Sequence, residues 1–480
     1  MIRFGTFTAL TTVLTLTTAA WAQDSQPITT QDEIGGIYEG AFKGGLQHGI
    51  GTYTLPNGYE YSGEWVEGEI QGNGVARFPN GSIYEGEFAK GKPEGLGKIT
   101  FADGGTYEGE WLDGEINGQG IAIYANGMRY EGAFAAGKHH GQGTMTNPDG
   151  YQYAGNWVEG HKEGKGKILQ ANGATYEGDI RDGKLDGFGK LTLPDGLVYE
   201  GEWLNDQMHG QGKLTLPNGD IYEGPLVAGR RQGNGKLSYA DGSSYQGAFE
   251  DDLRHGQGTF TGTDGYTYTG AWSGGQIEGQ GRVTYPDGSV YEGAFRADLP
   301  DGEGKVTYPD GSSYEGNWIA GVIEGEGTST YPNGVVYVGT FKNAKHHGQG
   351  VMTYTDGYRY EGGWDNNLRQ GEAVVTYADG SVYTGGFEAG QRQGSGKIVM
   401  VDGFSYEGHW EQGKITGKGI ARYANGDIYE GGFLNGKRQG PGVIRYASGQ
   451  EKAGQWENGA LVVDPTETVE DETTTEAASE

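Results

Sequence analysis

Hydrophobic and polar positions alternate along this chain in a pattern that repeats every 23 residues. Tyrosine recurs eighteen times at this interval, from Tyr38 to Tyr429, without an insertion or deletion, and a degenerate nineteenth copy begins at Lys452. With each tyrosine taken as position 0, glycine stands at position 2, and tryptophan or phenylalanine stands at position 4 in nearly every copy. Because alternate residues of a strand share a face, these positions predict a strand with one aromatic face. The glutamates between them predict a polar opposite face.

A second strand is predicted over positions 11 to 17 of each repeat. Positions 11 and 13 are glycine, position 15 is usually apolar, as at Ile99, and position 17 is often aromatic, as at Tyr308, with lysine and threonine between them. This alternation again gives one apolar and one polar face. Positions 19 and 20 are Asp-Gly or Asn-Gly in seventeen copies. We expect a three-residue turn with the glycine in the left-handed region, because it keeps both apolar sets on one face, whereas a two-residue turn does not.

The connection over positions 5 to 10 is polar and variable, and it is predicted to be a longer, exposed loop. Tandem units of this length predict an all-β fold: an elongated, single-layer antiparallel array of β-hairpin repeats, in which a twisted and coiled sheet of about 36 strands carries an aromatic groove. Three departures mark repeats seven to nine. Ile180 and Leu226 replace the aromatic residue at position 4, and Pro225 is predicted to break a strand and leave a weak or kinked zone.

A longer duplication of nine repeats, or 207 residues, relates the two halves of the array. The segment KHHGQG at Lys138 returns at Lys345, and the pattern DGYxY follows it both times. The sequence therefore predicts two homologous repeat domains. Residues 38–244 hold repeats one to nine, and residues 245–459 hold repeats ten to eighteen with a degenerate C-terminal cap repeat.

The two ends of the chain differ from the repeats. Residues 1–22 combine a basic start, an apolar stretch and a small-x-small motif, which predicts a signal peptide cleaved between Ala22 and Gln23. Residues 23–37 form a short N-terminal lead, and residues 460–480 form an acidic tail that is predicted to be disordered. We expect an exported protein with no transmembrane segment after cleavage. The periplasm of a Gram-negative bacterium is the first expectation for its location, and the extracellular space is the second.

Charge and motifs exclude several classes of function. The net charge is −30 at pH 7, which repels nucleic acid and makes anionic lipid headgroups poor partners. The chain has no cysteine, and it carries no HExxH, Walker A or nucleophile-elbow pattern. Its GxG pairs are strand glycines that precede no helix, and its recurring glutamates indicate a solvated face. We therefore expect no enzymatic activity, no cofactor and no metal.

The repeat unit resembles the MORN repeat (membrane occupation and recognition nexus). The segment YEGEWLDGEINGQGIAIYANG at Tyr107 carries the resemblance, and the repeat that begins at Tyr291 carries it as plainly. The resemblance covers about residues 38–459. It implies an elongated, groove-bearing single sheet that is often dimeric, with roles in scaffolding, in membrane-associated assembly and in phospholipid contact.

Two sets of candidate binding residues follow from the pattern. The first is the aromatic groove, whose rings suit stacking on a ligand: Tyr107, Trp111, Tyr153, Trp157, Tyr314, Trp318, Tyr360 and Trp364. The second is the duplicated histidine loop with its extra tyrosine, which suits a sugar, an anion or a metal: His139, His140, Tyr151, His346, His347 and Tyr358. Adjacent histidines on a strand point to opposite faces, which is poor metal geometry. The same loops are also ordinary inherited repeat sequence.

The predicted function is that of a non-catalytic exported scaffold or adaptor for envelope or membrane-associated protein assembly, with protein partners or a second copy of the chain. The alternative is a binding module for an extended envelope glycan or lipid, held through the Tyr/Trp groove. Stacking in such a groove should survive high salt, whereas lipid binding bridged by divalent cations should vanish with a chelator.

Overall fold

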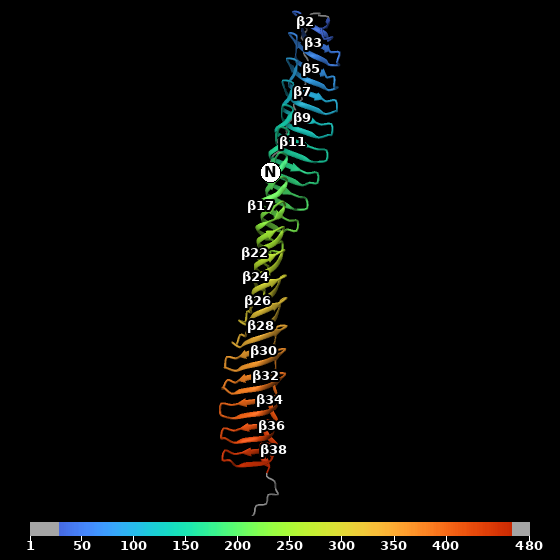
Figure 1. Ribbon diagram of the computed structural model, residues 1–480. Helices are drawn as coiled ribbons and strands as arrows, with labels where there is room; N and C mark the ends of the chain where they lie inside the picture. Colours follow the sequence, from blue (N-terminus) through green and yellow to red (C-terminus); the bar gives the residue numbers. More distant parts are fainter. Residues whose placement is uncertain (1–27, 463–480) are drawn as a thin grey trace, which may run out of the picture. The chain divides into compact units, whose positions relative to one another are not determined.

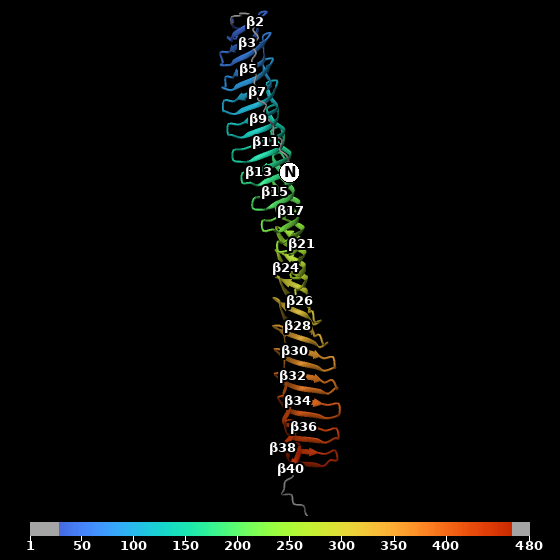
Figure 2. The same ribbon diagram turned by 180° about the vertical axis from the view of Figure 1, so that it is seen from behind.

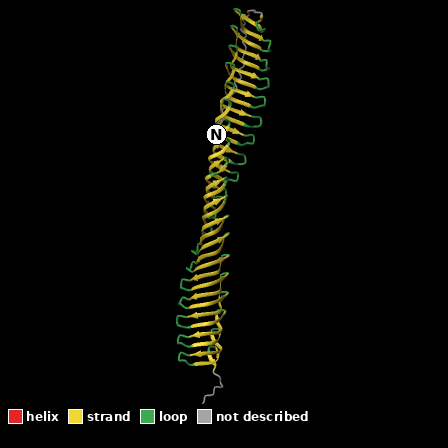
Figure 3. Ribbon diagram, viewed as in Figure 1, coloured by secondary structure: helices red, strands yellow, loops and turns green. Residues whose placement is uncertain are grey.

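The structure, a computed structural model, describes residues 28–462, and these form forty strands and no helix (Figures 1 and 3). The prediction of an all-β array of antiparallel hairpin repeats is confirmed. The predicted alternation of faces in the tyrosine strand is also confirmed. The tyrosine and the aromatic residue at position 4 are buried, and the residue after each tyrosine is exposed. Within the described residues, no helix is long and apolar enough to cross a membrane.

The chain divides into two compact units, with the boundary between Met208 and His209. In each unit the hairpins follow one another in chain order, as both the front view and the view from behind show (Figures 1 and 2). The predicted division after residue 244 rests on the sequence duplication and stays a prediction.

The strands of the first unit are β1 (Ile28–Gln31), β2 (Ile37–Lys43), β3 (Leu46–Thr54), β4 (Glu60–Val66), β5 (Glu69–Arg77), β6 (Ile83–Ala89), β7 (Lys92–Thr100), β8 (Thr106–Leu112), β9 (Glu115–Ile123), β10 (Arg129–Ala135), β11 (Lys138–Thr146), β12 (Gln152–Val158), β13 (His161–Leu169), β14 (Thr175–Arg181), β15 (Lys184–Thr192) and β16 (Val198–Leu204). Strand β17 (Gln207–Thr215) contains the boundary between the units.

The strands of the second unit are β18 (Ile221–Val227), β19 (Arg230–Arg231), β20 (Gly233–Ser238), β21 (Ser244–Glu250), β22 (Leu253–Thr261), β23 (Thr267–Ser273), β24 (Gln276–Thr284), β25 (Val290–Arg296), β26 (Leu299–Thr307), β27 (Ser313–Ile319), β28 (Val322–Thr330), β29 (Val336–Lys342), β30 (Lys345–Thr353), β31 (Arg359–Asp365), β32 (Leu368–Thr376), β33 (Val382–Glu388), β34 (Gln391–Val399), β35 (Ser405–Glu411), β36 (Lys414–Arg422), β37 (Ile428–Leu434), β38 (Lys437–Arg445), β39 (Glu451–Glu457) and β40 (Ala460–Val462).

Consecutive strands pair antiparallel within each unit, and the pairing around the tyrosine recurs from repeat to repeat. In β10, Tyr130 faces Ala122 on one neighbouring strand and Met145 on the other. The glycine at position 2, Gly132, likewise faces Gly120 and Gly143. In most repeats the tyrosine therefore lies between two apolar side chains, beside a row of paired glycines.

The Asp/Asn-Gly connection is the three-residue turn that the sequence predicts. The Tyr124 N–H donates to the Met128 carbonyl at 2.8 Å, and the Gly127 N–H donates to the Tyr124 carbonyl at 2.8 Å. Gly127 has φ of 82°, the left-handed conformation that closes a type I turn with a glycine bulge. Asn126 supports the turn, because its Oδ1 accepts the Met128 N–H at 3.0 Å.

The other connection is not the long exposed loop that the sequence predicts. It is a two-residue turn in which both residues have positive φ, as at Glu67 (49°) and Gly68 (89°), and this is the turn type that suits two twisted strands. The strands therefore run on through positions 5 and 8. A register shift between Gly63 and Trp65 makes this possible, because the extra residue of a bulge restores the pairing.

The core of each repeat consists of a tyrosine ring laid flat over two glycines. A Cβ atom added at Gly143 would overlap the ring of Tyr130, and one added at Gly132 would overlap the facing backbone, so glycine is strongly favoured at both positions; Ala373 is the exception at position 13. The Tyr130 hydroxyl donates to the Ala133 carbonyl at 2.9 Å. The ring then meets Phe134 edge to face, with centroids 4.9 Å apart, which is a favourable aromatic geometry.

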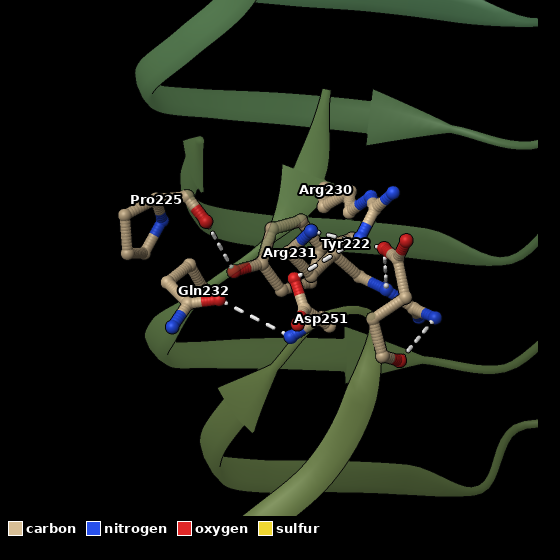
Figure 4. Close-up of polar contacts among 7 residues, drawn as sticks. Tyr222, Pro225, Arg230, Arg231, Gln232 and Asp251 are labelled. Carbon is tan, nitrogen blue, oxygen red and sulfur yellow. Dashed lines mark hydrogen bonds and ion pairs between the residues drawn. The ribbon is translucent and has the colours of Figure 1, made fainter. Parts of the chain in front are cut away.

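Pro225 does not break the strand that contains it. It lies inside β18 at position 3, where the register shifts in other repeats, and the interruption falls on the opposite strand, which splits into β19 and β20 at Gln232 (Figure 4). The Pro225 carbonyl accepts both the Tyr222 hydroxyl at 2.9 Å and the Gln232 N–H at 3.1 Å. The aliphatic replacements Ile180 and Leu226 are fully buried in place of the aromatic ring.

The described ends add two strands, β1 and β40, that the sequence did not predict. In the lead, β1 pairs with β2, and at the other end β39 and β40 form the degenerate nineteenth hairpin. Residues 460–462, assigned to the disordered tail, therefore belong to the array, because Leu461 faces Trp456. The predicted cleavage site at Ala22 and Gln23 and the rest of the tail lie outside the described residues.

Candidate binding surfaces

The eight residues of the predicted aromatic groove form a packed core. None of them exposes more than 9 % of its surface: Tyr107, Trp111, Tyr153, Trp157, Tyr314, Trp318, Tyr360 and Trp364. Within each repeat the tyrosine and tryptophan rings meet edge to face, with centroids 4.9 to 5.7 Å apart, as at Tyr360 and Trp364 (4.9 Å). An open groove lined by all these rings is therefore not formed, since the rings cover one another.

The polar tips of these rings are also occupied. The Tyr107 hydroxyl donates to the Glu110 carbonyl at 2.9 Å, and the Trp111 indole N–H donates to the Gly97 carbonyl at 3.2 Å. Burial raises the pKa of Tyr107 to about 12, so its hydroxyl stays protonated. Trp318 differs from its counterparts, because its buried indole nitrogen has no hydrogen-bond partner.

The first histidine of each duplicated loop is enclosed by aromatic rings. His139 stacks on Tyr130 with centroids 3.8 Å apart and meets the edge of Trp157 at 4.8 Å. Its Nε2 shares a hydrogen bond of 2.7 Å with the Tyr124 hydroxyl. Burial lowers the pKa of His139 to about 4, so its ring is neutral at neutral pH.

His346 repeats this arrangement in the second unit. It stacks on Tyr337 at 3.7 Å, meets Trp364 at 5.2 Å and shares a hydrogen bond of 3.1 Å with the Tyr331 hydroxyl. The backbone N–H of His346 donates to Asn367 Oδ1 at 2.8 Å, and burial lowers the pKa of the His346 ring to about 4. The environment of His139 and His346 is thus duplicated together with the sequence.

The other candidates of the duplicated loop lie elsewhere. His140 is exposed, and His347 lies 3.2 Å from an oxygen of Asp365, so adjacent histidines do point to opposite faces, as predicted. Tyr151 contacts the Lys162 amine, and Tyr358 lies under the Arg369 guanidinium at 5.3 Å. The extra tyrosines therefore contact the position-9 side chain of the following repeat. The ring nitrogen of each enclosed histidine is hydrogen-bonded to a different tyrosine, Tyr124 or Tyr331.

Position 9 is the feature that the sequence analysis missed. Its side chain lies over the tyrosine of its own repeat and the tryptophan of the next, where His139 and His346 sit. Arginine fills the place in several repeats of the second unit, with guanidinium-to-tryptophan distances of 4.1, 4.2 and 4.0 Å at Arg254, Arg392 and Arg438. A signal existed, because position 9 has the parity of positions 15 and 17, which are usually apolar or aromatic.

The polar face carries a trough floored by the paired glycines. Hollows of about 1000 Å³ in the first unit and about 590 and 1160 Å³ in the second are lined mainly by residues of positions 1, 2, 12, 13 and 14. Cross-strand ion pairs border it, such as Lys167–Glu177 at 3.5 Å and Lys305–Glu315 at 3.1 Å. Such exposed pairs each stabilise the sheet by about 0.2 to 1 kcal/mol.

A separate hollow of about 590 Å³ opens on the aromatic face of the second unit. Tyr314, Trp364 and His346 border it, together with Tyr331 and Arg369. Two of the eight predicted groove residues and one of the predicted histidines therefore meet at one cavity. Among the described residues there is no cluster of three or more histidine, aspartate or glutamate side chains able to hold a metal ion.

Solved structures offer weak similarities. They include the TCP domain of SAS-4 (dCPAP) from Drosophila melanogaster with a proline-rich motif of Ana2, at 15 % identity over 42 % of this chain and 90 % of that chain, with a TM-score of 0.20. The TCP10 domain of Danio rerio CPAP with a STIL peptide matches at 16 % identity over 66 % and 99 %, with a TM-score of 0.12. Virginiamycin B lyase from Staphylococcus aureus matches at 9 % identity over 57 % and 85 %, with a TM-score of 0.11. Scores this low carry no argument about fold or function.

Among curated proteins, none matches this chain. The sequence profile of the MORN repeat, by contrast, matches eighteen consecutive segments between residues 38 and 451. These segments coincide with the hairpins described above, each beginning at or near a repeat tyrosine. The chain belongs to the MORN repeat family.

Proposed function

We propose that this protein is a non-catalytic, exported scaffold or adaptor that holds envelope or membrane-associated proteins in an assembly. The observation that supports this most directly is the glycine-floored trough, which recurs at the same repeat positions in both units. An array that presents one surface many times at a regular spacing suits an extended partner or several copies of one partner.

The walls of the trough suit a polypeptide partner. In the first unit, Glu131, Lys165 and Glu177 supply charges of both signs, and Phe188 adds an apolar ring that is 53 % exposed. Aromatic rings are enriched at protein–protein interfaces, and a polar rim usually surrounds them. A second copy of this chain is one such partner.

The alternative function, binding of a glycan or lipid through the Tyr/Trp groove, loses its structural basis at most of the rings first proposed for it. Six of those eight rings lie outside the lining of the hollow on the aromatic face, and their faces are covered by neighbouring rings. A ligand would have to open the core to stack on them.

Cross-linking of the mature chain, from Gln23 onward, in its native envelope tests the scaffold role. We expect a stoichiometric protein partner. Ala154→Arg places a long charged side chain in the trough of the first unit and should abolish its capture. Ala171→Arg makes the same change at an exposed turn and serves as the control, with the partner retained.

Two outcomes would contradict the proposal. Capture that is unaffected by Ala154→Arg would show that the trough is not the binding surface. Enrichment of glycan or lipid without a stoichiometric protein would favour the alternative function.

A further inference from the structure

The hollow on the aromatic face of the second unit lies where one repeat departs from the pattern. Position 15 is apolar or aromatic in the other repeats, but it is Ser329 in this one. Ser329 faces Tyr314 on one neighbouring strand and Tyr337 on the other. Ser329 is smaller than Ile, Val or Leu, as are the alanines at position 15 of three other repeats, but it alone brings an aliphatic hydroxyl group to this column, and it lines the hollow.

Partly exposed tyrosines form one side of this hollow. Tyr308, Tyr331 and Tyr354 occupy position 17 of three successive repeats, directly after β26, β28 and β30, and all three line it. Tyr308 and Tyr331 expose 38 % and 37 % of their surface, unlike the buried tyrosines of position 0. Because they lie on alternate strands, they are about 9.6 Å apart along the sheet.

The charge of the hollow is opposite to that of the chain. The sequence holds 65 acidic residues against 35 lysines and arginines, yet none of the described residues that line the hollow is acidic, and one of them, Arg369, is a cation. The remaining polar groups are hydroxyls, amides and the neutral ring of His346. This local charge favours an anionic ligand.

Arg369 differs from the arginines that occupy position 9 elsewhere. Arg254, Arg392 and Arg438 each donate to a glycine carbonyl 21 residues further on, at 3.0, 3.1 and 2.7 Å. Within residues 28–462, Arg369 makes neither that bond nor an ion pair, and its guanidinium lies 4.9 Å from the centroid of Tyr360. Arg369 does contact Tyr358, with which it shares a side-chain hydrogen bond. A guanidinium has five N–H donors, so others remain for a carboxylate, which it can bind with two parallel hydrogen bonds.

We propose that this hollow binds an extended, β-1,4-linked glycan whose rings carry carboxylates. The position-17 tyrosines supply flat faces for the apolar sides of pyranose rings, and their spacing is close to the length of two β-1,4-linked rings. Arg369 receives a carboxylate of the glycan, and Ser329 and Asn367 receive its hydroxyls. The volume of about 590 Å³ lies within the range of small-ligand pockets. This function is independent of the scaffold role, since the trough is on the opposite face.

Calorimetric titration of the mature chain with a β-1,4-linked mannuronate hexamer tests the proposal. We expect saturable binding, and weaker binding by at least tenfold for the neutral cellohexaose. Arg369→Gln should lower the affinity for the hexamer about tenfold. Tyr354→Asn, which copies the residue of the first unit at this place, Asn147, should lower it by a similar factor.

The first unit supplies the matched controls. Lys162 is the counterpart of Arg369, 207 residues earlier, so Lys162→Gln should leave the affinity unchanged. Thermal unfolding of each variant separates loss of the site from loss of the fold, and only variants that unfold at the temperature of the parent chain are compared.

Three outcomes would overturn the proposal. The first is the absence of binding to the mannuronate hexamer by the unaltered chain. The second is an equal affinity for cellohexaose, or for a poly-glutamate peptide of the same charge. The third is an equal loss of affinity in Arg369→Gln and Lys162→Gln. None of these results depends on whether a protein partner occupies the trough.

Discussion

The His139 region of the first unit and the His346 region of the second carry the same sequence, KHHGQG, yet they differ where a ligand would touch them. Both keep the same enclosed histidine, stacked on a tyrosine at 3.8 and 3.7 Å. Around it, Ala122, Asn147 and Lys162 of the first unit correspond to Ser329, Tyr354 and Arg369 of the second. The comparison shows that the repeat keeps its core while positions 9, 15 and 17 are free to acquire new chemistry.

The physical reason is the way the core is assembled. Tyrosine at position 0 lies on two glycines and hydrogen bonds to its own strand, so any change there removes several contacts at once. A side chain at position 17 stands at the end of a strand and is partly exposed, as at Tyr331. Changes at position 17 therefore cost little stability and alter the surface.

The largest effect is expected from the tryptophans of the two regions. Trp157→Ala and Trp364→Ala should each destabilise the protein by about 3 to 5 kcal/mol, because each removes a buried ring and its hydrogen bond to a glycine carbonyl. Denaturant unfolding measures both. Similar losses of stability in the two variants would support equivalent cores in the two regions. A loss in only one variant would show that the two cores are not equivalent.

The second effect is a dependence of stability on pH. Burial holds the pKa of His139 and His346 at about 4, below the ordinary value of 6.5. A histidine whose pKa is lower in the folded state stabilises the fold above about pH 6.5, and that stability is lost as the pH falls toward 4. Each histidine should account for up to about 3 kcal/mol of this loss.

Unfolding midpoints at pH 7.5 and pH 4.5 measure the pH effect. His139→Ile and His346→Ile should each reduce the difference between the two midpoints, because isoleucine fills position 9 in other repeats, as at Ile323, and does not titrate. A difference that is unchanged in both variants would show that other groups cause it.

A smaller effect is expected from the tyrosine hydroxyls. Tyr130→Phe and Tyr337→Phe each remove a hydrogen bond to a backbone carbonyl, of 2.9 and 3.0 Å, and keep the ring. Each should cost about 1 kcal/mol, and more where the freed carbonyl stays buried without a donor. Denaturant unfolding measures the loss of stability in each variant. Unequal losses would show that the cores around Tyr130 and Tyr337 differ, although their sequences are alike.

The smallest effect is expected on the polar face. Lys167→Ala and Lys305→Ala each break an exposed cross-strand ion pair, of 3.5 and 3.1 Å, and should cost about 0.2 to 1 kcal/mol at low salt. At 1 M salt the cost should almost disappear, because ions screen exposed charges over a few ångströms. A loss that persists at 1 M salt would mean that the lysine stems pack on the sheet.

Much of the fold was open to prediction from the repeat. Parity placed tyrosine and tryptophan on one face, and the same argument gave the three-residue turn at Asn126-Gly127, which the structure confirms. The tight turn at Glu67-Gly68 was missed, because the bulge between Gly63 and Trp65 lies in the pairing of two strands and changes no residue that a pattern would reveal. Because the tight turn was missed, the second strand was predicted to begin at position 11, and position 9 was assigned to a loop.

The candidate site was predicted only in part. His139 and His346 were chosen for their duplication, and the structure places both at equivalent, enclosed points. The prediction that the aromatic rings are exposed in a groove is wrong. The pattern shows on which face of the strand a ring such as Trp111 lies, but it does not show which side chains cover that ring. Ser329 carried a signal, as the polar exception in an apolar column, although its effect depends on what the neighbouring strands leave empty.

The sequence by itself determined the repeat, its two strands, their faces and the membership of a family, because these follow from local spacing and from the fit of glycine beside tyrosine. Only the tertiary structure decided which aromatic rings are covered and where a hollow opens. The reason is that burial is a property of neighbouring repeats: the ring of one repeat is covered by position 9 of its own repeat and by the tryptophan of the next. A single departure such as Ser329 acquires meaning only among those neighbours.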